Sequence, residues 1–221
     1  MEIHKKRSFS IFELISYTFV SVAFIISAVS LLFSLKSADA KITRSDILLS
    51  LAQCALGIFA INLPILLSTL YNIKFSPALT VLYFAFLYCS VYLGEVKRFY
   101  IDVPHWDDLL HFSSGIMLCS FIVTVLPFSK IFRSENSLSI VLLLTIAVSF
   151  SLTVGILWEI YEFAVDHFFD LNMQKYRLST GEPLQGHSAV FDTMKDIIID
   201  LLGALTSAII SFFSLKRKFI H

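Results

Sequence analysis

The sequence predicts an all-α protein: a polytopic integral membrane bundle of about six transmembrane helices. Hydrophobic residues make up 57% of the 221 positions and charged residues only 15%, which is typical of chains that lie in a lipid bilayer. The apolar residues are gathered into successive runs, each close to the ~20 residues that a helix needs to cross the hydrocarbon core. The formal net charge is zero, so nothing in the composition indicates nucleic-acid binding.

The expected helices follow one another in a single transmembrane domain that covers residues 1–221. The first apolar run follows a short basic stretch, as in a signal peptide, but it is too long for such a segment and is interpreted as a transmembrane helix. Pro77 and Pro104 precede later helices, where proline is favoured. The expected spans are residues 11–35, 47–71, 77–94, 106–128, 138–166 and 191–214.

Pro64 predicts a kink in the second helix. Proline has no N–H to donate and its ring disturbs the preceding turn, so backbone groups lose their partners there. Asn62 and Ser68 are the nearby polar side chains that we expect to satisfy those groups.

The alternation of six spans places three polar stretches at one surface of the membrane: the start of the fourth helix, the end of the fifth and the start of the sixth. Trp106 and Trp158 lie beside two of these stretches, and tryptophan favours the membrane–water interface. Lys and Arg are slightly more frequent on the side that holds the termini, which favours cytoplasmic termini. The polar surface then faces outward, and the loop 167–190 over it has the length of a lid or of a simple tether.

The three polar stretches carry acidic residues at helical spacing. In WDDLLHFSSG, residues 106–115, spacings of three and four return Asp107, Asp108 and His111 to one helix face. WEIYE repeats that spacing in the fifth helix, and DTMKDIIIDLLGA extends it along the sixth. The acidic residues of these two stretches are Glu159, Glu162, Asp192, Asp196 and Asp200.

So many carboxylates in apolar helices require compensation, because each costs about 2.5–3.5 kcal/mol at the centre of a bilayer. A shared cation, mutual protonation or a water-filled cavity would provide it. Helix bundles present carboxylate and imidazole to metals at this spacing, and an oxygen-rich set with one histidine suits Mg, Mn, Fe or Zn. The candidate metal ligands are Asp108, His111, Glu159, Glu162, Asp192 and Asp196.

Several of these residues also have a purely structural explanation. Asp107, Asp108 and Asp192 lie at helix starts, where a carboxylate caps the helix and complements its dipole. Glu159 and Glu162 lie near a helix end, where a negative charge is unfavourable, so capping does not explain them.

Asp200 lies deepest in the apolar part of the sixth helix. It is about 12 Å beyond Asp192, from a rise of ~1.5 Å per residue, where a carboxylate requires an interior polar partner. A single histidine such as His111 is more often a core residue with satisfied hydrogen bonds than a ligand. The position of all three acidic stretches at one membrane surface nevertheless favours a functional polar site.

The order of these motifs resembles that of a known family. D-x-x-H followed by S-S-G, then W-E-x-x-E, then Q-G-x-x-x-x-x-D-T-x-x-D ending in G-A, is similar to YjdF-like bacterial inner-membrane proteins and, more distantly, to VanZ-type proteins. The resemblance extends over residues 77–214; His187 departs from it, because an acidic residue is expected there. It implies a multi-pass protein of the bacterial cytoplasmic (inner) membrane and no particular reaction. The residues of the third motif are Gln185-Gly186, Asp192-Thr193, Asp196 and Gly203-Ala204.

The leading functional hypothesis is a metal-dependent enzyme that acts on a lipid-linked or envelope substrate, because a site at the membrane surface reaches a headgroup without extracting the lipid tail. Glu162 is the candidate general base, and Asp192 is the second candidate catalytic residue. The alternative is an ion or proton transporter with Asp200 in a relay, although few polar residues continue the path beyond it. A third hypothesis is a non-catalytic membrane protein whose acidic cluster only holds three helices together.

Overall fold

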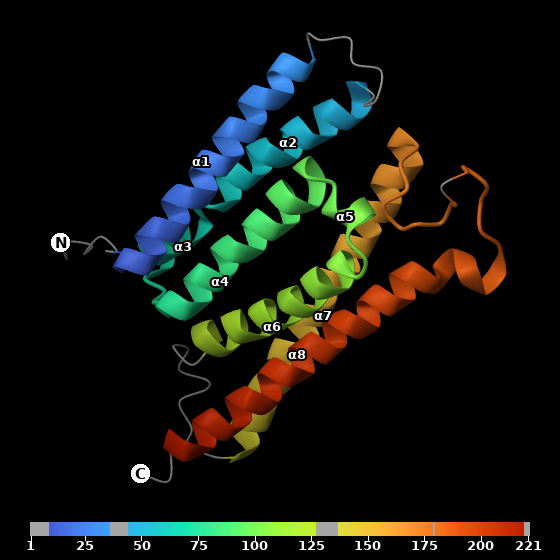
Figure 1. Cartoon of the computed structure of the whole chain (residues 1–221). Helices are drawn as coiled ribbons and strands as arrows, with labels where there is room; N and C mark the ends of the chain where they lie inside the picture. Colours follow the sequence, from blue (N-terminus) through green and yellow to red (C-terminus); the bar gives the residue numbers. More distant parts are fainter. Residues whose placement is uncertain (1–8, 36–43, 127–136, 179, 219–221) are drawn as a thin grey trace. The chain divides into compact units, whose positions relative to one another are not determined.

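The computed structural model describes residues 9–35, 44–126, 137–178 and 180–218. Helices account for 84% of these residues, and none of them belongs to a β-strand. Within the described ranges, six helical segments are long and apolar enough to cross a membrane. The predicted all-α polytopic fold is therefore confirmed (Figure 1).

The helical elements follow the predicted order, and two of the spans are divided. In chain order the elements are α1 (Ile11–Ser34), α2 (Arg44–Ala60), α3 (Leu63–Tyr71), α4 (Pro77–Leu87), the π-helix η1 (Tyr88–Val96), α5 (Phe99–Asp102), α6 (Trp106–Val125), α7 (Ser137–Phe169), the 3-10 helix η4 (Gly186–Val190) and α8 (Phe191–Lys218).

Several helix ends differ from the predicted ones. α7 runs to Phe169 instead of residue 166 and α8 to Lys218 instead of 214. α2 begins at Arg44, before the second span, whose bounds Ile47–Tyr71 are the predicted ones. A helix can continue beyond the apolar run that marks a span, so hydropathy alone underestimates its length. η1 likewise extends the third span to Val96. The predicted end of the fourth span at 128 lies outside the described residues.

The chain divides into two compact units, residues 1–106 and residues 107–221, and each is described by itself. The expectation of a single transmembrane domain stays a prediction. In the first unit, α1 packs against α2 and α4. Its buried core consists of Val20, Phe24, Ile61, Phe84 and Leu87.

The predicted kink in the second span is the break between α2 and α3. Pro64 has no N–H, so the carbonyl of Ala60 lacks its helical partner; the Tyr83 hydroxyl donates to that carbonyl instead, at 2.7 Å. Asn62 Nδ2 donates to the carbonyl of Ile58 at 2.9 Å, as expected of this side chain. Tyr83 lies in α4, so the sequence around the kink did not reveal its role.

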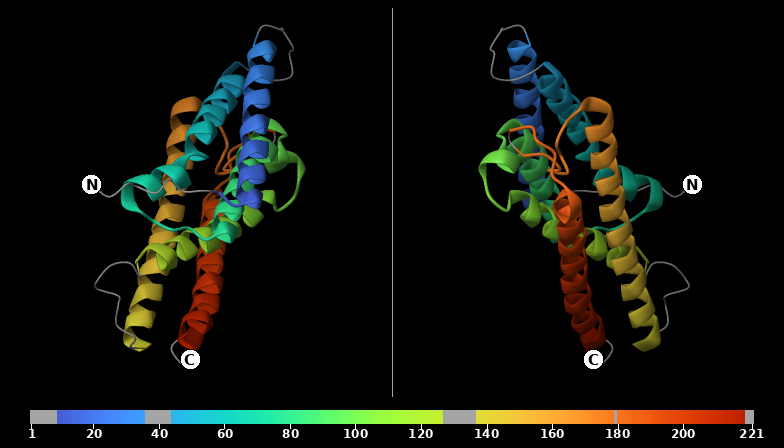
Figure 2. Two further views of the ribbon diagram at one scale, coloured as in Figure 1. Left: turned by 90° about the vertical axis from the view of Figure 1, so that its left-hand side faces the viewer. Right: turned by 90° about the vertical axis from the view of Figure 1, so that its right-hand side faces the viewer.

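The second unit contains α6, α7 and α8, and α7 and α8 run side by side in it (Figure 2). One end of this three-helix group is apolar: its core consists of Cys119 and Ile122 from α6, Ile140, Leu144 and Ala147 from α7, and Ala204 and Ala208 from α8. The acidic residues lie toward the other end of the same helices. The polar site therefore lies next to a buried apolar core formed by the same three helices.

Glycines bring α6 and α8 into backbone contact. A Cβ atom at Gly203 would overlap the backbone carbonyl of Phe112, and one at Gly115 would overlap the backbone of Asp200 and Ala204. The helices can approach this closely only where side chains are absent. This crossing sets the distance between the acidic faces of α6 and α8.

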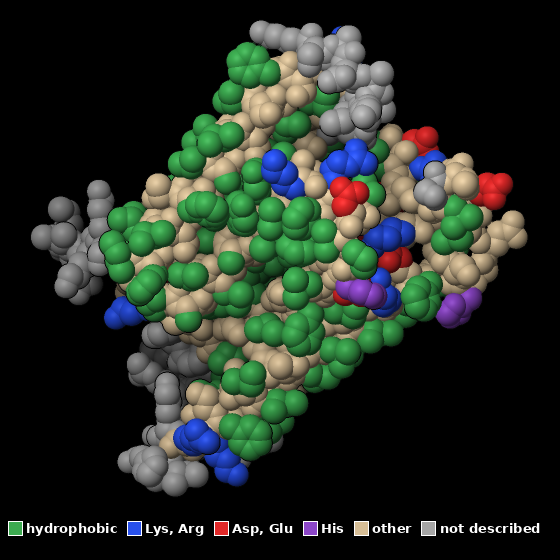
Figure 3. All heavy atoms as spheres, viewed as in Figure 1, with side chains coloured by type: hydrophobic (Ala, Val, Ile, Leu, Met, Phe, Trp, Pro, Cys, Tyr) green, Lys and Arg blue, Asp and Glu red, His purple; other side chains and the backbone are tan. Residues whose placement is uncertain are grey.

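Large apolar side chains cover much of the exterior. Phe12 of α1 and Ile210 of α8 are 71% and 65% exposed. Figure 3 shows that hydrophobic side chains dominate the visible face. Apolar exposure on this scale suits a lipid surrounding, in agreement with the expected multi-pass membrane protein.

Gly203→Ala should destabilise the second unit. Alanine is the better helix former by about 1 kcal/mol, but its Cβ meets the α6 backbone, and overpacking costs about 1–3 kcal/mol. We expect a lower melting temperature of the detergent-purified protein, measured by intrinsic fluorescence. Thr206→Ala, a partly exposed position on the same helix, is the control; a Gly203→Ala variant as stable as this control would contradict the close crossing.

Candidate functional site

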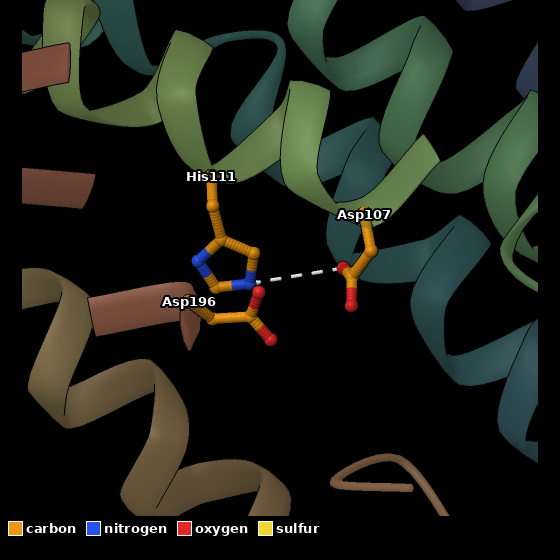
Figure 4. Close-up of side chains that lie close together, drawn as sticks. All are labelled: Asp107, His111 and Asp196. Carbon is orange, nitrogen blue, oxygen red and sulfur yellow. Dashed lines mark ion pairs between the residues drawn. The ribbon is translucent and has the colours of Figure 1, made fainter. Parts of the chain in front are cut away.

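The polar site of the second unit is centred on His111, which lies on α6 and is buried. Its Nδ1 atom is 3.2 Å from Asp200 Oδ2 on α8. Its Nε2 atom faces the other way, 3.7 Å from Asp107 Oδ1 and 3.9 Å from Glu159 Oε1. Figure 4 shows His111 between Asp107 and Asp196. The imidazole thus joins the acidic faces of all three helices.

Five residues form what we call the inner cluster. All are buried, with at most 6% of the residue exposed, and they combine the imidazole with four carboxylates. The inner cluster consists of His111, Glu159, Glu162, Asp196 and Asp200. Two groups of side chains around the same imidazole have ligand atoms within 4.8 Å of one another: Asp107 with His111 and Asp196, and His111 with Glu159 and Glu162.

Asp200 holds His111 in one orientation. Its second oxygen, Oδ1, accepts a hydrogen bond from Ser114 Oγ at 2.8 Å, and the absence of a side chain at Gly155 leaves room for the carboxyl group. A proton on Nδ1 satisfies Asp200 and leaves the Nε2 lone pair directed at Asp107 and Glu159. Histidines that ligate metals are commonly held by a carboxylate on the opposite nitrogen in this way.

The carboxylates of the inner cluster are only partly satisfied. Trp158 Nε1 donates to Glu162 Oε1 at 2.8 Å, and Gln174 Nε2 lies 3.5 Å from Glu159 Oε2. The buried oxygens Glu159 Oε1 and Asp196 Oδ1 accept no hydrogen bond from the described residues. Buried oxygens normally have partners, so these two atoms require a further positive or hydrogen-donating group.

Five partly exposed residues surround the inner cluster, and we call them the outer ring: Asp107, Asp108, Asp192, Lys175 and Lys195. Lys175 Nζ is 2.6 Å from Asp107 Oδ2 and 3.2 Å from Asp192 Oδ1. Lys195 Nζ is 2.8 Å from Asp108 Oδ1 and 3.3 Å from Asp192 Oδ1. Carboxylate and ammonium groups therefore alternate in one row, from Asp107 at one end to Asp108 at the other.

The loop after α7 delivers Lys175 into the outer ring. Asp166, buried near the end of α7, accepts the backbone N–H groups of Met173 at 2.7 Å and Gln174 at 3.0 Å. Lys175 has a φ of +49°, a left-handed conformation that L-residues rarely adopt. Burial acts to lower the pKa of Lys175, but Asp107 and Asp192 more than offset it, so the pKa is raised and the side chain stays charged.

Gln174 ties the same loop to the helices. Its Nε2 atom donates to Thr193 Oγ1 on α8 at 2.8 Å and to the carbonyl of Glu159 on α7 at 3.3 Å. The part of the loop next to the site is thus fixed by side chains of both helices. The loop is also shorter than predicted, because α7 runs to Phe169 and η4 begins at Gly186.

The matching family covers the whole site. Residues 15–217 match the family described as "Predicted membrane protein (DUF2238)". The chain belongs to this family. A protein of Thermotoga maritima, described as "Uncharacterized protein", is 32% identical to this DUF2238 member over 117 residues, or 52% of each chain. The match thus spans about half the length of that relative. No solved structure matches.

The six predicted ligands of this DUF2238 protein occupy two environments. His111, Glu159, Glu162 and Asp196 belong to the inner cluster, whereas Asp108 and Asp192 lie in the outer ring and pair with lysines. Their role as metal ligands stays a prediction. His187, at which the sequence departs from the resembling family, is exposed on η4, next to Phe191.

Sequence reasoning left three contributors out of the ligand set. Asp107 precedes His111 by four residues, and Asp200 was recognised as a buried carboxylate, so both had a signal in the sequence. Lys175 had none, because its contacts depend on how the loop folds over α6 and α8.

Asp166→Asn should release the loop from the site. The carboxylate accepts two backbone N–H groups, and each charge-assisted hydrogen bond contributes roughly 1.5–3 kcal/mol. We expect trypsin to cleave after Lys175 and Arg177 on the order of tenfold faster in detergent, as followed by mass spectrometry. Glu182→Gln, the same change of charge in an exposed part of the loop, is the control. Equal cleavage in both variants would show that Asp166 does not hold the loop.

Proposed function

We propose that this protein is a metal-dependent membrane enzyme that acts on a lipid-linked or cell-envelope substrate, with a divalent cation bound at the inner cluster. The observation that supports it is the pair of buried oxygens, Glu159 Oε1 and Asp196 Oδ1, that accept no hydrogen bond from described residues. The first lies 3.9 Å from His111 Nε2. Leaving such atoms without a partner is costly, and a cation bound beside them would lower that cost.

The ligand atoms in this proposal come from both parts of the site. They form two alternative sets that share the His111 imidazole, one with Asp107 and Asp196 and the other with Glu159 and Glu162. One nitrogen with several oxygens suits Mg, Mn, Fe or Zn. Such a cation would polarise a phosphoryl oxygen or activate water.

Other residues of the site hold the reacting groups in place. Glu162 is the proposed general base, because the Trp158 indole fixes one of its oxygens beside the cluster. Asp192, the second proposed catalytic residue, binds both lysines of the outer ring, as Asp108 binds one of them. We therefore assign Asp108 and Asp192 to charge balance and substrate orientation ahead of metal ligation.

The proposed setting is a bacterial cytoplasmic membrane, with cytoplasmic termini and the site at the outer surface. The kinship with YjdF-like and VanZ-type proteins that the motifs suggest is part of the same proposal. A lipid-linked substrate fits a site that lies near the ends of spanning helices, since the headgroup reaches it while the tail stays in the bilayer.

The apolar core favours an enzyme over a transporter. A relay needs a continuous polar path to the other membrane surface. Beyond Asp200 the three helices meet through Cys119, Ala147 and Ala204, and the contact between the Ser120 and Ser207 hydroxyls, at 2.8 Å, is a short polar patch within this apolar region. The non-catalytic alternative predicts that the acidic residues affect stability without binding a ligand.

Elemental analysis of the purified protein tests whether a metal ion is bound. After loading with Mn²⁺ or Zn²⁺ and desalting, we expect about one ion per chain. His111→Ala should lose it, because the nitrogen ligand is removed, while the exposed His187→Ala should retain it. No retained ion in the unmodified protein, or equal retention in both variants, would overturn the proposed metal site.

Asp200→Asn should weaken metal binding without removing a ligand. Asparagine preserves the shape but no longer favours the proton on His111 Nδ1, and loss of such a supporting contact typically costs 10–100-fold in metal affinity. Competition with a chelator measures the dissociation constant. Ser207→Ala, which removes a polar contact between the same two helices, α6 and α8, controls for general loss of stability; an equal effect of the two changes would argue against a role for Asp200 in orienting His111.

A further inference from the structure

Two ammonium groups of the outer ring converge on one oxygen atom. Asp192 Oδ1 lies 3.2 Å from Lys175 Nζ and 3.3 Å from Lys195 Nζ. The lysines come from different elements, the loop after α7 and the second turn of α8. Because both contacts end on the same oxygen, the two ammonium groups are close enough to bind one small anionic group together.

The lysines lie at the opening of the site. Their side chains are 40% and 30% exposed, whereas the side chain of Asp196 behind them is 1% exposed. Lys195 stays 3.7 Å from Asp196 Oδ1 and makes no hydrogen bond to it. If the lysines served only to neutralise buried acids, these deep oxygens would be their best partners. Both ammonium groups instead pair with carboxylates of the outer ring, where a ligand that enters the site can reach them.

Lys175 is held in this place by the fold. Its neighbours Met173 and Gln174 are fixed by Asp166, and its own backbone is left-handed. A carboxylate oxygen that receives two ammonium groups resembles a phosphoryl oxygen in charge and size. Lysine binds phosphate as a compact point charge with three donors.

We propose that Lys175 and Lys195 bind a phosphate group of the substrate, which displaces Asp192 from between them. This inference rests on the proposed function and names its substrate class: a compound with a terminal phosphate, either a lipid headgroup or a free phosphate. The carboxylates outnumber the lysines in the site, so a cation on the inner cluster favours binding of the anion by lowering the negative charge it meets. Phosphate and metal are therefore expected to bind together.

The test uses the full-length protein, metal-loaded and in detergent, titrated with inorganic phosphate by calorimetry. A second arm uses nanodiscs that contain phosphatidic acid, which has a terminal phosphate, or phosphatidylglycerol, which has only a diester. Lys175→Gln and Lys195→Gln should each weaken phosphate binding by about tenfold, from the loss of one charge-assisted contact. Lys97→Gln, an exposed lysine of the first unit, should leave it unchanged.

Asp192→Asn gives the opposite expectation. Neutralising the competing carboxylate should strengthen phosphate binding, an effect that a variant with a damaged fold would not produce. Lys175→Arg and Lys195→Arg preserve the charge and should retain most of the binding.

The results separate the phosphate site from the metal site. Binding of inorganic phosphate that depends on the lysines supports a free phosphate as the source, and lysine-dependent binding of phosphatidic acid alone supports a lipid headgroup. If the metal binds but neither probe does, or if the Lys→Gln variants bind as well as the unmodified protein, the phosphate site is overturned and the metal site stands. Lysine-dependent phosphate binding without retained metal would overturn the metal enzyme and leave the phosphate site in place.

Discussion

The arrangement of the polar site depends on the contact between His111 and Asp200. Both side chains are buried, and neither would be stable in an apolar helix bundle without the other, because an unpaired buried carboxylate is costly. The contact requires several small residues: Gly155 leaves space for the carboxyl group, Ser114 satisfies its second oxygen, and Gly203 lets α6 and α8 approach. The orientation of the imidazole, and with it the direction of Nε2, follows from these neighbours.

The sequence predicted the fold well because the membrane imposes a simple rule on it. Apolar runs of spanning length become helices, and the kink at Pro64 follows from the missing N–H. The prediction was weaker at helix ends, as at Phe169 and Lys218, because a helix can continue beyond its apolar run. It also did not find the partner of the kink, Tyr83, since a hydrogen bond between helices depends on packing that local sequence does not specify.

The candidate site was predictable in its helical part. Spacing of three and four residues placed Asp107 and His111 on one face, and alternation of the spans brought Glu159 and Asp196 to the same surface. Spacing could not say which carboxylates face inward and which pair with lysines, because a small rotation of a helix changes that assignment. The contribution of Lys175 could not be predicted from the sequence, since irregular loops lack a periodic pattern.

The glycine crossing of α6 and α8 has a consequence for how this site can change over time. Backbones that touch directly leave no layer of side chains to repack, so substitutions can hardly change the α6–α8 crossing next to the site. The loop that carries Gln174 and Lys175 is attached through side chains instead, to Asp166, Thr193 and Asp107 among others. Changes among related proteins would therefore be concentrated in this loop, whereas the α6–α8 crossing would stay the same. New specificities would then arise from the loop alone.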